Sequence, residues 1–432
     1  MTMQAENSPS GIRREFDQTF RSLKHRNFRI YFIGQMISLS GTWMQGVALS
    51  WLVYRMTHSP VVLAQVECAN LFPMLFFGLL GGSLADKLDR KKMLLCTQSL
   101  AMLQAVVLAT LTLTNQLQVW EAICLAAWLG TCSAFEVPSR QALLVDLIDR
   151  ENLVNAISLN SSLFNGARAI GPALAGILVA AAGEGICFAL NAVSYLAAIV
   201  AIALLRVPKR EKLSRSETQH VSEALKFVWH EPSVRRVLLL AVIMSLFGLQ
   251  YSVLMPVFAS DVLHGDVKTL GALRAAAGVG AFIAALTLAN RGSGDFLKYA
   301  VGFASVTFSI SLIAFCFSTN FWVSVVLSSV VGLSMTTQLS GGHSLFQLAV
   351  SDKLRGRVMS IYMTVMLGIA PFGSYFVGLC ASRWGAPSTV AVCALICGCA
   401  GSLYLFSVRA ARLAAEHNPI QEAVPSESVR DG

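Results

Sequence analysis

The sequence predicts an all-α membrane protein with twelve transmembrane helices arranged as two six-helix bundles. Of its 432 residues, 55% are hydrophobic and only 13% are charged, which excludes a soluble globular protein of ordinary composition. Long stretches contain no Asp, Glu, Lys or Arg, and a helix needs about 20 apolar residues to cross a bilayer. One long polar interval, at 207–232, divides the chain into halves of similar length.

The twelve spans are expected in three groups. Six stretches without Asp, Glu, Lys or Arg each have room for one helix: 30–54, 93–120, 185–205, 237–260, 358–382 and 384–408. The uncharged stretch 299–351 is long enough for two spans, with a turn at 318–320. Four further spans contain one or two ionisable residues each: 60–85, 119–138, 153–182 and 267–290.

Polar segments flank the two bundles. The predicted organisation is a cytoplasmic N-terminal lead at 1–27, a bundle at 28–206, a cytoplasmic linker at 207–232, a bundle at 233–410 and a disordered cytoplasmic tail at 411–432. The lead is polar and basic, so no cleavable signal peptide is expected.

The net charge of +9 follows membrane topology rather than nucleic-acid binding. With a cytoplasmic N-terminus, 28 of the 33 Lys and Arg residues lie on the cytoplasmic side, in line with the positive-inside rule. Arg55, Lys268, Arg274 and Arg383 are then placed on the other side, and Arg168 within a span. An even number of spans puts the C-terminus in the cytoplasm as well.

Two segments indicate an internal repeat. AIGPALAGIL in the fifth span has a weak counterpart in APFGSYFVGL of the eleventh, where Gly373 and Gly378 correspond to Gly171 and Gly176 at an offset of 202 residues. Parallel repeats of this kind place a substrate site at their interface near the bilayer midplane. The repeat therefore favours a transporter over a passive membrane anchor.

The loop between the second and third spans carries the densest motif, GSLADKLDRKK, which begins at Gly82. The carboxylate of Asp86 is suited to cap the positive N-terminal end of a facing helix, and the adjacent Arg90 is suited to hold it. Lys91 and its basic neighbours also serve simply to keep a loop in the cytoplasm, and this alternative stays open.

Together with PSRQALLVDLIDRENLVNA (138–156), GARAIGPALAG (166–176) and FQLAVSDKLRGRVMS (346–360), this loop resembles the major facilitator superfamily, in the branch of the enterobactin exporter and macrolide efflux proteins. The resemblance implies a bacterial inner-membrane transporter. It also implies that Asp86 contacts the start of the eleventh span, near Gly356, while the cytoplasmic side is closed. Asp89 stands where the superfamily commonly has glycine.

The fifth span contains Gly166, Gly171, Pro172 and Gly176, which resemble the signature of proton-coupled drug exporters. Small residues let a helix approach its neighbour, and proline bends it. The pattern favours export over import, although Gly and Pro are common in membrane helices generally.

Three ionisable residues within spans are candidate functional groups, because a charge there costs at least about 2.5 kcal/mol. Glu67 and Glu136 are candidate proton carriers, and Arg168 is suited to bind a carboxylate, phosphate or catecholate. A structural ion pair of Arg168 with Glu67, and a gate role for Glu136, are the alternatives. Gln45, Asn165 and Gln250 are candidates for a polar cavity wall, although hydrogen bonding between helices explains them equally well.

The predicted function is secondary active transport, with proton-coupled export of a medium-sized amphipathic compound, a siderophore or drug, as the preferred form. The expected partners are that small molecule, protons and membrane lipid, with no nucleic acid, and the chain is expected to be monomeric. No cofactor or metal is expected, since the ten cysteines lack the spacing of a zinc site. The sequence contains no GxxxxGK[ST] loop, so neither an enzyme nor an ATP-driven pump is expected. A nutrient importer of the same fold and a non-transporting sensor or scaffold remain as alternatives.

Overall fold

The computed structural model describes residues 21–206, 221–291, 294–350 and 355–417, and every regular element within them is a helix. The N-terminal half begins with a short turn, η1 (Arg21–Lys24). Its helices are α2 (Arg26–Thr57), α3 (Pro60–Lys87), α4 (Arg90–Leu113), α5 (Val119–Asp146), η2 (Arg150–Asn152) and α6 (Leu153–Leu204).

The C-terminal half has a less regular start. Its elements are α7 (Val221–His230), α8 (Pro232–Ile243), η3 (Met244–Gly248), η4 (Leu249–Ser252), α9 (Met255–Val257), η5 (Phe258–Val262), α10 (Val267–Arg291), α11 (Gly294–Cys316), α12 (Phe321–Leu348), α13 (Arg355–Trp384) and α14 (Ala386–His417). Thus α7 lies within the expected linker, and α14 continues past residue 410. Residues 1–20, 207–220 and 418–432, which include most of the expected lead, linker and tail, lie outside the described residues.

Ten helical segments of the described chain are long and apolar enough to cross a membrane, which confirms the predicted all-α membrane fold. One of them, in α6, is interrupted at Gly183, whose φ of 83° and ψ of 169° suit glycine but few other residues. Its two arms, 153–182 and 184–204, each have the length of one crossing. The 32-residue helix α2 is not among the ten, because polar residues such as Gln35 and Gln45 lower its hydropathy.

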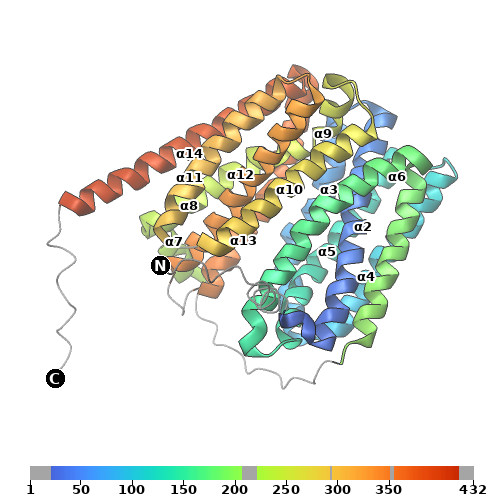
Figure 1. Cartoon of the computed structure of the whole chain (residues 1–432), viewed down its shortest axis with the longest axis horizontal. Helices are drawn as coiled ribbons and strands as arrows, with labels where there is room; N and C mark the ends of the chain where they lie inside the picture. The colour runs from blue at the N-terminus through green and yellow to red at the C-terminus, as the bar shows by residue number, and fades with distance from the viewer. Residues whose placement is uncertain (1–20, 207–220, 292–293, 351–354, 418–432) are drawn as a thin grey trace, which may run out of the picture.

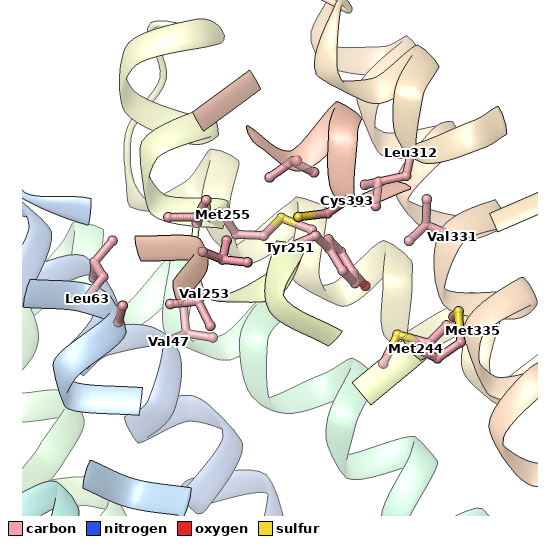
Figure 2. Packing of buried hydrophobic residues seen from close by; sticks show 14 of the residues in the cluster. Val47, Leu63, Met244, Tyr251, Val253, Met255, Leu312, Val331, Met335 and Cys393 are labelled. Carbon is pink, nitrogen blue, oxygen red and sulfur yellow. The ribbon is translucent and has the colours of Figure 1, made fainter. Parts of the chain in front are cut away.

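The helices pack within each half and also between the halves (Figure 1). In the N-terminal half α6 lies against α2 and α4, and α3 against α5; in the C-terminal half α12 lies against α10 and α11, and α11 against α14. Between the halves, α6 packs on α10 and α3 packs on α13. One buried apolar cluster continues across this boundary, with Val47 and Leu63 from one half near Val253 and Met255 from the other (Figure 2).

Glycine contacts repeat within the two halves. A side chain at Gly130 of α5 would strike the carbonyl oxygen of Asn70 in α3, and one at Gly332 of α12 would strike that of Ala277 in α10. Gly130 and Gly332 are 202 positions apart, the offset found in the sequence, whereas Asn70 and Ala277 are 207 apart. The helices α3 and α10 are therefore counterparts whose register differs by five residues from that of their neighbours.

The contacts between the halves follow the same relation. Gly176 of α6 lies against the backbone of Val267, Lys268 and Gly271 at the start of α10. Gly378 of α13 lies against Pro60, Val61 and Ala64 at the start of α3, each 207 positions earlier. Close backbone approach at small residues thus joins the halves through two equivalent interfaces.

These contacts lie toward one side of the membrane. We call the side where α2 begins, with Arg26 and the loop at Arg90, the basic side, and the other the opposite side. The starts of α3 and α10 both lie on the opposite side. There the Tyr54 hydroxyl at the end of α2 also donates a hydrogen bond to Asp261 Oδ2 of η5, at 2.5 Å. The halves are therefore closed together on the opposite side.

Candidate functional site

A cluster of three charged side chains lies between the two halves. Arg274 of α10 interacts electrostatically with Glu67 of α3 and with Arg168 of α6, and Tyr251 of η4 lies among the same groups. We call Glu67, Arg168 and Arg274 the charged cluster. Glu67 and Arg274 each lie seven residues into their helices, about 10 Å from the opposite-side ends. The cluster thus has two positive charges and one negative charge at membrane depth.

The position of Arg274 corrects the sequence prediction, which placed this residue outside the membrane on the far side. It lies two turns inside α10 because that helix begins at Val267 and its apolar face continues through Leu270 and Leu273, both fully buried. The prediction counted Arg274 on the far side in the charge tally, although the expected span at 267–290 already contained it. The signal that would have found Arg274 is the repeat, since it is the counterpart of Glu67 at the offset of 207.

A proline in the neighbouring span explains how Arg274 is held. Pro256 has no backbone N–H, so the carbonyl oxygen of Ser252, four residues earlier, has no helical donor. The span is irregular there, passing from the π-helix η3 to the 3-10 turn η4. Arg274 Nη2 donates to this free Ser252 oxygen at 2.8 Å. The break in the helix thus anchors one edge of the guanidinium group.

Arg168 is held by an aromatic ring and by a close helix contact. Its guanidinium carbon lies 5.7 Å from the ring centre of Trp43 on α2, within the range of a cation–π interaction. Pro172 removes the helical donor for the Arg168 carbonyl oxygen, and a Cβ on Gly278 of α10 would lie 2.7 Å from that oxygen. Gly278 is one turn from Arg274, so this contact brings the two arginines to the same interface.

Glu67 faces Arg274 without a direct ion pair. Among the described residues, no salt bridge or hydrogen bond involves the Glu67 carboxylate. Because α3 and α10 are counterparts, Glu67 and Arg274 occupy the same position in the two halves with opposite charges. The proposed structural pair of Glu67 with Arg168 is likewise absent from the salt bridges of the described part of the chain.

Glu136 belongs to a separate polar group inside the N-terminal half. It interacts with Arg140, one turn further along α5, whose guanidinium carbon lies 5.9 Å from the ring centre of Phe164. Tyr31 is nearby, and its hydroxyl donates to Asn160 Oδ1 at 3.4 Å. Glu136 therefore does not join the charged cluster.

The three neutral candidates make hydrogen bonds within or between helices. Gln45 is 1% exposed, donates to Gln104 at 3.1 Å and accepts from Asn191 at 2.8 Å, so it connects α2 to α4 and α6. Gln250 is 2% exposed and donates to the carbonyl oxygen of Ala370 in α13 at 3.2 Å. Asn165 donates to Ser161 in its own helix at 2.9 Å. The structure places none of them in the charged cluster.

The glycines of the fifth span differ from one another. A Cβ at Gly171 would lie 2.6 Å from Trp43 Cβ and 2.7 Å from the Ser40 carbonyl oxygen, so this glycine seats α6 on α2. Gly176 seats α6 on α10, as described above. A Cβ at Gly166 would meet nothing within 4 Å. Close packing therefore depends on two of the three predicted positions.

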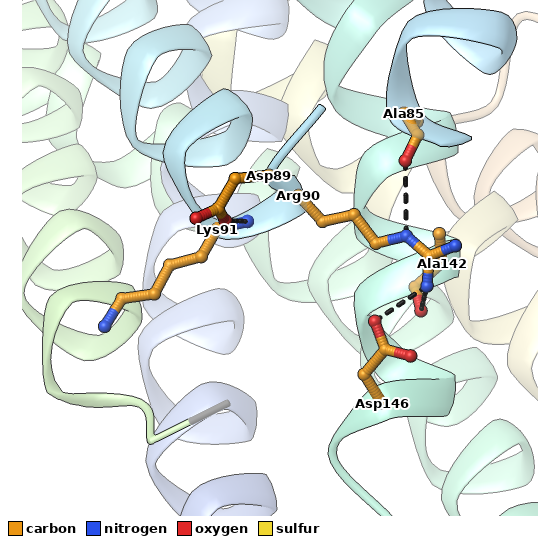
Figure 3. A network of polar contacts seen from close by, with 6 residues as sticks. All are labelled: Ala85, Asp89, Arg90, Lys91, Ala142 and Asp146. Atoms are coloured by element: carbon orange, nitrogen blue, oxygen red, sulfur yellow. Dashed lines mark hydrogen bonds and ion pairs between the residues drawn. The ribbon is translucent and has the colours of Figure 1, made fainter. Parts of the chain in front are cut away.

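The basic loop is tied to the N-terminal half (Figure 3). Arg90 forms an ion pair with Asp146 of α5 at 2.7 Å and donates to the carbonyl oxygens of Ala85 and Ala142 at 3.2 Å each. Lys91 Nζ donates to the carbonyl oxygens of Ala203 and Leu205 at the end of α6, at 2.8 and 2.7 Å.

Asp89 of the same loop is the N-cap of α4, accepting from the backbone N–H of Lys91 at 3.0 Å. A helix cap accounts for an acidic residue at this position. Gly82 has open space around a would-be Cβ. The side chain of Asp86 and the region around Gly356, which the predicted contact joins, lie outside the described side chains.

No three His, Cys, Asp or Glu residues in the described ranges are grouped so that they could hold a metal ion.

Proteins of known function that resemble this chain are membrane transporters. A family model described as transmembrane secretion effector matches residues 17–429. The chain is similar to the staphyloferrin A transporter of Staphylococcus aureus, with 27% identity over 90% of this chain and 98% of that protein. It is also similar to macrolide efflux protein A of Streptococcus pyogenes, with 22% identity over 84% and 92%, and to the multidrug efflux pump Tap of Mycolicibacterium fortuitum, with 24% identity over 81% and 88%.

Two solved structures share the fold. A bacterial homologue of the human lysosomal transporter Spinster, in an inward-facing and occupied conformation, has a TM-score of 0.71 and 13% identity over 88% of this chain and 96% of that chain. The nucleoside transporter NupG has a TM-score of 0.64 and 12% identity over 88% and 98%.

Proposed function

Because this chain belongs to the transmembrane secretion effector family of the major facilitator superfamily, and is a transporter and not an enzyme, we propose that it exports a medium-sized amphipathic compound, a siderophore or a drug. The observation that carries the proposal is the charged cluster at the boundary between the halves. Such a place is where alternating-access transporters built from repeats bind their substrates. The names of three relatives support export as the direction.

The proposed topology has twelve crossings in two bundles of six. It counts α2 once, α6 twice and the irregular segment from α8 to η5 once. Both termini and the basic side lie in the cytoplasm of the inner (plasma) membrane, with bundles at 28–206 and 233–410 and a linker between them, and the unit is a monomer within lipid. This assignment puts the loop of Arg90 and Lys91 inside, as the positive-inside rule requires.

In the proposed cycle the two halves start closed on the extracellular side, where Tyr54 and Asp261 are hydrogen-bonded in this structure. They separate on that side after the substrate binds. Arg90 keeps the loop on the N-terminal half through Asp146. In the proposed cycle Asp86 contacts the start of α13 when the cytoplasmic side closes. Such a contact stabilises one of the two states only, which is the property of a gate.

Export is tested in a strain that lacks the gene, compared with the same strain expressing the wild-type protein. Cells are loaded with candidate siderophores and antibiotics, and retained compound is measured with and without a proton gradient. Export predicts greater retention in the deletion strain for at least one compound. Equal retention of every compound would contradict the proposal, and lower retention would indicate an importer.

We further propose that protons drive the cycle and that Glu67 or Glu136 carries them, because both carboxylates lie at least seven residues inside their helices and neither forms a salt bridge in the described part of the chain. Glu67→Gln or Glu136→Gln should lower gradient-driven export at least about tenfold, since an amide cannot exchange a proton. The measurement is substrate uptake into inverted membrane vesicles, which corresponds to export from the cell, under an imposed pH gradient. The control is Glu121→Gln, which alters an exposed helix cap. Full gradient dependence in both variants would refute the assignment.

Removing the Tyr54 hydroxyl should favour opening on the opposite side. Tyr54→Phe deletes one hydrogen bond to a carboxylate, worth about 1.5–3 kcal/mol, so the outward-open population should rise at least about tenfold. Spin labels at His58 and His264, in a cysteine-free background, report the distance between the halves on that side. The control is Tyr375→Phe, at an exposed ring of α13. An unchanged distance distribution would show that this bond does not hold the halves together.

A further inference from the structure

The charged cluster contains two arginines, Arg168 and Arg274, but one carboxylate, Glu67. In the described part of the chain Glu67 is the one carboxylate that interacts with Arg274, and Arg168 adds a second guanidinium group beside it. A carboxylate in the membrane is balanced by one arginine, so the other remains without a counter-ion in the described part of the chain. Unpaired charges at this depth are costly, and proteins keep them where they bind something.

The two guanidinium groups also have unused hydrogen-bond donors. Arg274 bonds the Ser252 carbonyl oxygen through Nη2, but its Nε is buried and has no partner. Arg168 contacts the face of Trp43, which uses its charge but none of its N–H groups. A guanidinium group has five N–H donors in a planar fork, and leaving a buried donor without a partner costs free energy.

The backbone fixes the spacing of the arginines across the boundary between the halves. The close approach of Gly278 to Arg168, and of Gly271 to the carbonyl oxygen of Pro172 at 2.7 Å from a would-be Cβ, locks α6 against α10. Arg168 comes from one half and Arg274 from the other. A ligand that bonds both would therefore bridge the two halves that must move during transport.

We propose that Arg168 and Arg274 together bind an anionic oxygen group of the exported compound, such as a carboxylate, so that the transported substrate is an acid. The inference rests on the proposed function and narrows it, since a cationic compound would be repelled by the surplus positive charge. Glu67 is the internal counter-ion of Arg274 and a positioning residue. A planar fork that meets two oxygens gives both affinity and orientation, which a lysine would not supply.

The experiment uses the deletion strain complemented with wild-type protein or with single variants. Medium and cell extracts are compared by mass spectrometry to find compounds whose appearance in the medium depends on the wild-type protein. These compounds are then applied to an anion-exchange resin at neutral pH. The variants are Arg168→Gln, Arg274→Gln and Arg274→Lys, with Arg383→Gln at an exposed position of α13 as the matched control. The amount of each variant in the membrane is measured alongside.

The expected result is that the dependent compounds are retained by the resin. Each glutamine variant should lower their export at least about tenfold at equal protein amount, because an arginine–carboxylate bond is lost. Arg274→Lys should recover part of the loss, and Arg383→Gln should export normally. Dependent compounds that pass through the resin, or normal export by both glutamine variants, would overturn the inference while leaving export standing. If no compound depends on the wild-type protein, the proposed function itself fails.

Discussion

We expect the single variants Glu67→Arg and Arg274→Glu each to destabilise the protein strongly. We expect the double variant, which exchanges the two charges, to recover most of the lost stability. Glu67→Arg would put three guanidinium groups together, and at an effective dielectric constant of about 20 two like charges 4 Å apart repel by about 4 kcal/mol. Arg274→Glu would leave two carboxylates facing each other and the Ser252 carbonyl oxygen without its donor. The double exchange again places one carboxylate and one arginine at the counterpart positions 67 and 274, with Arg168 unchanged beside them.

The readouts are the amount of protein in the membrane and the melting temperature in detergent. Each single variant should be strongly reduced in both, and the double variant should recover most of the melting temperature. The same exchange at Asp295 and Lys298, an exposed pair 3.0 Å apart on α11, is the control and should change little in any combination. A double variant as unstable as the two single ones would show that the two side chains are not coupled.

Gly171→Ala is expected to be among the most damaging substitutions, while Gly166→Ala in the same helix is tolerated. The added methyl at residue 171 would lie 2.6 Å from Trp43 Cβ and 2.7 Å from a backbone oxygen, neither of which is a flexible end that could move away. Forcing atoms into a packed interface costs about 1–3 kcal/mol or more. It would also displace Trp43, which supports Arg168.

At residue 166 the methyl meets open space, and alanine is favoured over glycine in a helix by about 1 kcal/mol. Melting temperatures of the two variants should therefore move in opposite directions, and export should fall only for Gly171→Ala. Equal stability of the two would mean that α6 does not seat on α2 through Gly171.

The membrane fold and the family were predictable from the sequence because both are written in composition and in local motifs. Uncharged stretches are long, and the signature of the basic loop and that of the fifth span each lie within a short run of consecutive residues. Asp89 shows the limit of motif reading, since its departure from the usual glycine is explained only by the cap it makes for α4. The ion pair of Arg90 with Asp146 joins residues that no motif connects.

The charged cluster was predicted in part. Glu67 and Arg168 were identified because they interrupt apolar spans, but Arg274 was counted on the far side of the membrane although the expected span at 267–290 contained it. Gln45 and Gln250 could not be sorted from the sequence, because a neutral polar side chain satisfies a cavity wall and a helix interface equally well. Which neighbour it meets depends on helix rotation, and hydropathy that is nearly even around a membrane helix does not set that rotation.

If the charged cluster binds an acid as proposed, its surplus positive charge would make transport sensitive to voltage. With a monovalent acid bound, the cluster and its ligand are together neutral, so the loaded protein would reorient without moving charge. After release, and with Glu67 ionised while Glu136 carries the proton, the empty cluster would have a charge of +1, and an inside-negative potential would pull it back toward the cytoplasm by up to about 2.3 kcal/mol per 100 mV. The membrane potential would then act on the return step of each cycle, so that the cell's resting voltage resets the empty carrier for its next load.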